Sequence, residues 1–109
     1  MKLTNDALLT QLGYSITEHT LKDLEIIEKN TNGFETIKNH IIALNDHLKT
    51  IDGYVAMSST NPYLKIKIKA DEETAIKACL DEINKWANKY NVELKKVNDK
   101  TFYILGVKK

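Results

Sequence analysis

The sequence predicts an α+β protein in which a helical hairpin precedes two units that each contain one helix and two strands. Three observations support this fold class. Apolar residues recur at spacings of three and four in two long segments, which is typical of amphipathic helices. Apolar residues alternate with lysines from Leu64 to Lys69, which is typical of a strand with one buried face. The pattern of residues 33–70 returns in residues 71–109.

The segment before the two units is expected to form the helical hairpin. Residues 4–12 match a short amphipathic helix, and Gly13 is suited to end it. Ser15 and Glu18 have the spacing of a capping box, which predicts a second helix that starts there. A cluster of turn-forming residues then separates this hairpin from the third helix.

A shift of 39 residues overlays the second unit on the first without a gap. The overlay predicts a four-stranded, mostly antiparallel sheet with the helices on one face, and leaves open where the hairpin packs. An alternative is that any αββαββ chain with similar loops would overlay equally well. The overlay matches Leu64, Ile66 and Ile68 with Tyr103, Leu105 and Val107. We expect a single domain over residues 1–109, divided into a hairpin (1–32), a first αββ unit (33–70) and a second αββ unit (71–109).

Composition and charge exclude several classes of protein. No apolar run approaches the roughly 18 residues that span a membrane, so we expect no membrane partner. The start of the chain lacks the apolar region of a secretory signal, and Cys79 is the only cysteine, so we expect a cytoplasmic location. Residues 1–60 have five Lys against eight Asp and Glu, and residues 61–109 have eleven against seven, so the charge balances are −3 and +4.

The strand from Leu64 predicts the main surface feature. Its lysines are expected to share one sheet face, and the overlay places Phe102 and Ile104 on that same face. Because a solvent-facing surface seldom presents two large apolar side chains together, we expect a second subunit, a ligand or the hairpin to cover them. The predicted binding surface comprises Tyr63, Lys65, Lys67, Lys69, Phe102 and Ile104.

The lysine row has two interpretations. It can be a basic platform for nucleic acid, with Tyr63, Phe102 and Tyr103 as stacking rings. It can instead prevent edge-to-edge aggregation of the strand, which is the interpretation favoured by the near-neutral net charge and by the absence of arginine. Without arginine, the chain lacks bidentate contacts to phosphate or guanine.

The sequence contains no convincing catalytic or metal-binding arrangement. His40 and His47 lie two helical turns apart, and no metal-binding motif includes them. The overlay matches His40 with Cys79, so a Cys–His pair between the two helices is conceivable, although a buried structural cysteine is the simpler interpretation. No cofactor is expected, and the sequence favours a binding protein over an enzyme.

These observations predict a small non-enzymatic module that binds a protein partner or a second copy of itself. A nucleic-acid-binding domain that uses the lysine-rich sheet face is the alternative. A second alternative is a small ligand-binding protein or enzyme with its site near Cys79 and His40.

Overall fold

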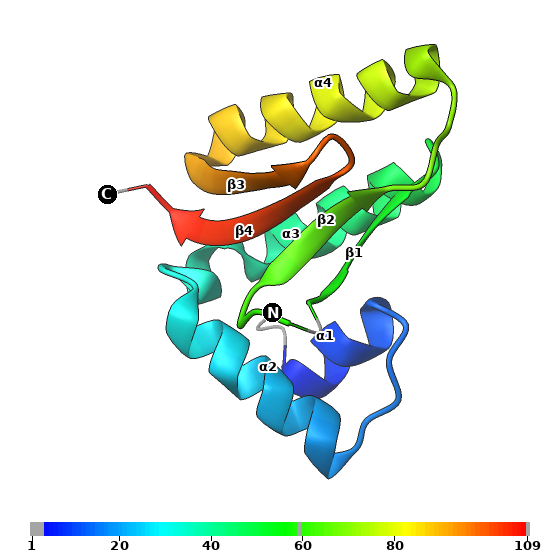
Figure 1. Ribbon diagram of the computed structural model, residues 1–109. Helices are drawn as coiled ribbons and strands as arrows, with labels where there is room; N and C mark the ends of the chain where they lie inside the picture. The colour runs from blue at the N-terminus through cyan, green and yellow to red at the C-terminus, as the bar shows by residue number, and fades with distance from the viewer. Residues whose placement is uncertain (1–3, 59, 109) are drawn as a thin grey trace.

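The computed structural model describes residues 4–58 and 60–108. Within these residues the strands form one sheet in the order β1-β2-β4-β3, and its three strand pairings are antiparallel. The predicted α+β fold is therefore confirmed (Figure 1). The elements are α1 (Asn5–Gln11), α2 (Glu18–Asn30), α3 (Phe34–Lys49), β1 (Gly53–Met57), β2 (Leu64–Ile68), α4 (Glu73–Tyr90), β3 (Val92–Asn98) and β4 (Thr101–Val107).

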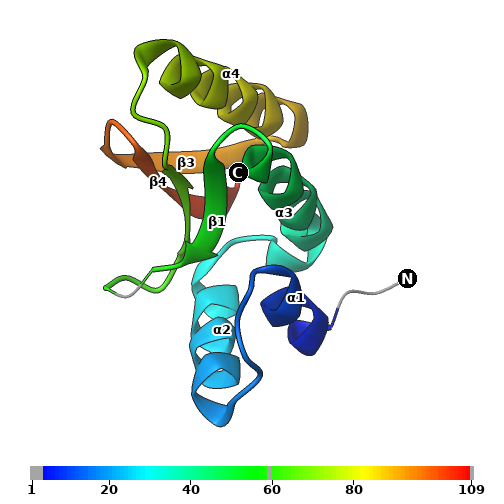
Figure 2. The ribbon, with the colours of Figure 1, turned by 90° about the vertical axis from the view of Figure 1, so that its right-hand side faces the viewer.

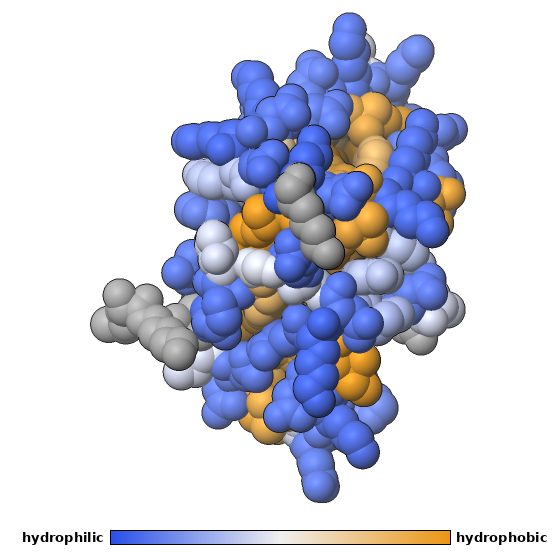
Figure 3. All heavy atoms as spheres, turned by 90° about the vertical axis from the view of Figure 1, so that its left-hand side faces the viewer, coloured by the Kyte–Doolittle hydropathy of each residue, from blue (hydrophilic) through white to orange (hydrophobic). Residues whose placement is uncertain are grey.

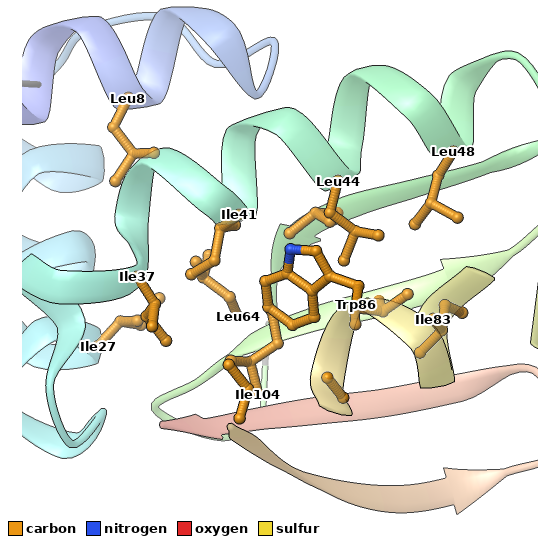
Figure 4. Packing of buried hydrophobic residues seen from close by; sticks show 14 of the residues in the cluster. Leu8, Ile27, Ile37, Ile41, Leu44, Leu48, Leu64, Ile83, Trp86 and Ile104 are labelled. Carbon is orange, nitrogen blue, oxygen red and sulfur yellow. The ribbon is translucent and has the colours of Figure 1, made fainter. Parts of the chain in front are cut away.

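Helices α3 and α4 lie side by side on one face of the sheet (Figures 1 and 2). The core between them and the sheet includes Leu64, Ile66 and Ile68, which are almost fully buried. Trp86 of α4 projects into this core toward α3, as Figure 4 shows, and its indole Nε1 donates a hydrogen bond of 2.9 Å to the carbonyl of His40. Burial of these large apolar side chains is the main force that stabilises the two-layer arrangement.

The arrangement of the two αββ units is symmetric about the β2–β4 pair. Each unit forms a β-hairpin, and the two hairpins join through their second strands. Helices α3 and α4 run antiparallel, so that His40 stacks on Tyr90 while Cys79 donates a hydrogen bond to the carbonyl of Ile51. The shift of 39 residues matches His40 with Cys79 and Ile51 with Tyr90, so these are equivalent contacts in the two units. Such a pair of contacts is expected when two units face each other across an approximate twofold axis.

The N-terminal helices pack at one end of the core, beside α3 and the β1 edge, and leave the second sheet face uncovered (Figure 2). Leu8 and Leu9 of α1 are fully buried there. The cap of helix α2 lies two residues later than the predicted capping box, because Thr17 and Thr20 exchange the reciprocal side-chain-to-backbone hydrogen bonds that define such a box.

The outer edge of β1 is closed by side chains from other elements. The amide of Val55 donates a hydrogen bond of 2.8 Å to Oδ1 of Asn45, which is buried on α3. The amide of Met57 donates a hydrogen bond of 2.9 Å to the hydroxyl of Tyr14. Because these amides already donate hydrogen bonds, the outer edge of β1 has few free donors with which an additional strand could pair.

Strand β4 contains a bulge where the turn between α2 and α3 docks. The register of β4 against β3 shifts by one residue between the pairs Glu93–Gly106 and Leu94–Ile104. Gly106 has φ = +125°, and Asn32 pairs with it through hydrogen bonds to the neighbouring backbone groups. A Cβ atom at Gly106 would lie 2.4 Å from the backbone nitrogen and oxygen of Asn32, so this close approach requires glycine.

Candidate functional site

The candidate site is the sheet face opposite α3 and α4, which no helix in residues 4–58 and 60–108 covers (Figures 1 and 2). Residues that face each other in an antiparallel pair point to the same side of the sheet. Lys65 pairs with Ala56 on β1 and with Tyr103 on β4, and Tyr103 pairs in turn with Lys95 on β3. We call the following residues the open face: Tyr54, Ala56, Tyr63, Lys65, Lys67, Lys95 and Tyr103.

The predicted alternation in β2 is present in the structure. Leu64, Ile66 and Ile68 are buried, while Lys65 and Lys67 are half-buried on the open face. Lys69 follows the end of the strand and is exposed, and its amide donates a hydrogen bond to the carbonyl of Asp52. The two strand lysines are therefore part of the open face, and Lys69 lies just beyond its rim.

The prediction that Phe102 and Ile104 share the lysine face is wrong. Ile104 pairs with Leu64 and is fully buried, and Phe102 pairs with Ile66 and packs against the core. The bulge beside Gly106 inserts one residue into β4, which an overlay without gaps misses. A slip of one residue turns every side chain of a strand to the other face, so Tyr103 occupies the open face instead.

Tyr63 and Tyr103 form an aromatic pair on the open face. Their ring centroids are 5.8 Å apart, and the ring planes are tilted by 32°. The side-chain amide of Asn61 donates a hydrogen bond of 2.7 Å to the hydroxyl of Tyr103, which anchors this ring to the loop that connects β1 and β2. The β1–β2 loop and strand β4 therefore both hold this aromatic pair in position.

The polar groups of this loop change the acidity of Tyr103. Hydrogen bonds from Thr60, Asn61 and Ser58, together with the charge of Lys65, lower the pKa of Tyr103 from its ordinary value near 10 to about 8. A small part of the Tyr103 side chains is thus ionised at neutral pH, and the fraction rises steeply above it. The hydroxyl is a stronger hydrogen-bond donor than that of an ordinary tyrosine.

The charged side chains that define the open face are lysines, and Glu93, two residues before Lys95 on β3, adds one acidic group on the same side. Among the described residues, Lys65, Lys67 and Lys95 form no ion pair, whereas Lys96 and Lys100 pair with Asp99 and Asp71. Unpaired lysines beside an aromatic pair leave positive charge available to an anionic ligand.

The position of β2 bears on the two interpretations of the lysine row. Lysines that prevent aggregation are found on edge strands, where they oppose pairing with another chain. Strand β2 lies between β1 and β4, so Lys65 and Lys67 have no edge to protect. The edge strands are β1, whose outer amides bind Asn45 and Tyr14, and β3, whose exposed Lys96 fits this protective role.

The helix side of the molecule does not contain the Cys–His pair. Cys79 contacts Ile51 and His40 stacks on Tyr90. The segment from Cys79 to Tyr90 spans roughly 16 Å, because a helix rises about 1.5 Å per residue. Burial raises the pKa of the Cys79 thiol and nearby Asp52 raises it further, so the thiol is a poor nucleophile as well as distant from His40.

A shallow groove follows the outer side of the α3–α4 pair. Its volume is ≈ 470 Å³, and it is lined by His47, Glu82, Trp86 and Tyr90 among others. His47 Nε2 lies 3.3 Å from a carboxylate oxygen of Glu82, so these polar groups satisfy each other. The described residues include no cluster of three or more His, Cys, Asp or Glu side chains that could hold a metal ion.

The comparisons with known proteins add no further evidence about this site. No family model, curated protein or solved structure matches the chain. No helix among the described residues has both the length and the apolar character needed to cross a bilayer.

The predicted binding surface omits four residues of the open face, namely Tyr54, Ala56, Lys95 and Tyr103. It also omits Asn61, which anchors Tyr103. One signal for the missing bulge is present in the sequence, because an isolated glycine inside a strand, such as Gly106, often marks a bulge or a close backbone approach.

Proposed function

We propose that the protein is a non-enzymatic binding module that takes an anionic partner on the open face. The observation behind this proposal is that two internal-strand lysines, Lys65 and Lys67, form no ion pair with any residue that the structure describes and lie beside the tyrosine pair. Lys65 and Lys67 lie on an internal strand, so protection of a sheet edge does not account for them. Binding an anion is the function that uses their positive charge.

The expectation of self-association has lost its structural premise. It depended on Phe102 and Ile104 lying at the surface, and both belong to the covered side of the sheet. The large exposed apolar side chains among the described residues are Ile16 in the α1–α2 loop, Ile26 on α2 and Val97 on β3. On the side of the molecule that Figure 3 shows, the hydrophobic areas are separated by hydrophilic side chains.

The proposal includes a cytoplasmic location, which the single free cysteine supports. Cys79 is a buried thiol that forms a hydrogen bond to a backbone carbonyl, and it has no second cysteine to pair with. Such a chain gains no stability from an oxidising compartment. A polyanion in the cytoplasm is the partner that this surface would meet.

Chromatography on immobilised heparin at neutral pH tests the proposal with a generic polyanion. We expect the wild-type protein to be retained at low salt and the double variant Lys65→Gln/Lys67→Gln to elute earlier. The matched control is Lys85→Gln/Lys89→Gln, which removes the same charge from exposed positions on α4. Equal retention of the two double variants, or no retention of the wild type, would contradict the proposal.

A further inference from the structure

Building on the proposed function, we infer that the open face binds single-stranded nucleic acid, with bases stacking on Tyr63 and Tyr103 and phosphates contacting the neighbouring lysines. The first support is the placement of the two kinds of side chain. Tyr103 lies between Lys65 on β2 and Lys95 on β3 in one row across three strands. Because directly opposite Cβ atoms are about 5 Å apart, both ammonium groups are within reach of a nucleotide that stacks on this ring.

The aromatic pair favours a nucleic acid over an acidic peptide. Every base has a π-face, so base–aromatic stacking needs no particular sequence, and it adds to the attraction between lysine and phosphate. Acidic peptides offer carboxylates but seldom offer planar rings to two neighbouring tyrosines. The ring centroids of Tyr63 and Tyr103 are 5.8 Å apart, so they can serve neighbouring bases of one strand.

The same surface favours a single strand over a duplex. Bases in a duplex are stacked on each other and cannot meet a tyrosine ring without being turned out of the helix. The chain has no arginine for bidentate contacts to guanine in the major groove. The open face also contains no helix that could enter a groove.

The structure also predicts the strength and salt dependence of binding. If Lys65, Lys67 and Lys95 each neutralise one phosphate, the logarithm of the binding constant should fall with the logarithm of the salt concentration with a slope of about −2. This modest slope predicts weak, sequence-tolerant binding. The double lysine variant should reduce the magnitude of the slope by about 1.4, because two of the three contacts are lost.

Fluorescence anisotropy with labelled oligonucleotides tests the inference. The probes are single-stranded DNA and single-stranded RNA of about 12 nucleotides and a DNA duplex of the same length. Titrations at salt concentrations between about 50 and 200 mM give the slope. We expect one or both single strands to bind more tightly than the duplex, and the comparison of DNA with RNA identifies the preferred chemistry.

Variants of Tyr103 separate stacking from charge. Tyr103→Leu should weaken single-strand binding by between about 5-fold and about 150-fold, because it removes the ring and retains an apolar side chain. Tyr103→Phe keeps the ring and should bind within a few-fold of the wild type. Circular dichroism and urea denaturation of each variant establish that it is folded.

The outcomes separate this inference from the proposed function. Binding of heparin that depends on Lys65 and Lys67, combined with equal affinity for duplex and single strand and no effect of Tyr103→Leu, overturns the inference and leaves the proposed function standing. Binding of no polyanion overturns both. Single-strand preference that is lost in Tyr103→Leu and retained in Tyr103→Phe supports both.

Discussion

The two faces of the β2–β4 pair differ in burial, polarity and charge. On the covered face, Leu64 pairs with Ile104 beneath helices α3 and α4, and both side chains are almost fully buried. On the open face, the very next pair consists of Lys65 and Tyr103, which are only half-buried. The same two strands thus stabilise the fold with one set of side chains and present a polar, aromatic and positively charged surface with the other.

Substitutions on the two faces should therefore affect different properties of the protein. Changes on the covered face should lower the free energy of unfolding, whereas changes on the open face should alter binding with little loss of stability. Neighbouring positions along β4 should therefore respond in opposite ways.

The largest expected effect comes from neighbouring substitutions in β4. Ile104→Ala should lower the free energy of unfolding by about 2–5 kcal/mol, because it leaves a cavity in the covered core. Tyr103→Ala should cost less than about 1 kcal/mol, because its side chain lies on the uncovered face. Urea denaturation of both variants measures the difference, and a larger loss for Tyr103→Ala would reverse our assignment of the two faces.

The next largest effect tests the bulge that sets this assignment. Gly106→Ala should lower the free energy of unfolding by about 3 kcal/mol, because the backbone has φ = +125° and the added Cβ meets Asn32. Gly13→Ala is the matched control, because Gly13 also has a positive φ, of +89°, but has no atom within 4 Å of the added Cβ. We expect a loss of about 1 kcal/mol for this control. Equal losses in thermal or urea denaturation would mean that the contact with Asn32 is not close.

The smallest expected effect is a pH dependence of the open face. The pKa of Tyr103 is lowered to about 8, so the absorbance of one tyrosinate should develop near pH 8 in an ultraviolet titration. Asn61→Ala removes one of the responsible hydrogen bonds and should move this titration to higher pH. A wild-type titration in which every tyrosine ionises near pH 10 would contradict the environment described for Tyr103.

The sign of the pH effect follows from the direction of the pKa shift. Because the folded pKa of Tyr103 lies below the unfolded value, its contribution to stability is fully present above about pH 10 and is lost as the pH falls through about 8. Affinity for an anion should change in the opposite direction, since the tyrosinate adds a negative charge between Lys65 and Lys95. Binding should therefore weaken as the pH rises through 8, and a constant affinity across this range would place the ligand away from Tyr103.

Much of the covered face could be predicted from the sequence, because periodicity reports burial directly. The alternation from Leu64 to Ile68 correctly predicted which side of β2 is buried. The open face was predicted only in part, because the bulge beside Gly106 is a single-residue event that reverses the faces of Phe102, Tyr103 and Ile104. Pattern matching without gaps cannot detect such an event.

Other features depend on tertiary contacts that leave no periodic trace. The position of the N-terminal hairpin is set by contacts of Leu8 and Leu9 with the core and by the hydrogen bond between Tyr14 and β1. The antiparallel packing of α3 and α4 separates Cys79 from His40, although the overlay had placed them at matching positions. Composition and spacing do not determine the direction in which two helices pack.

The most direct test of the central claim, that the open face is the binding surface, is a two-dimensional amide NMR titration of the folded protein with a short single-stranded oligonucleotide. We predict that the resonances that shift most belong to the central strands β2 and β4, with Lys65 and Tyr103 among them, while those of α3 and α4 change little. Shifts that are confined to the α3–α4 groove, or the absence of shifts at low salt, would contradict the claim.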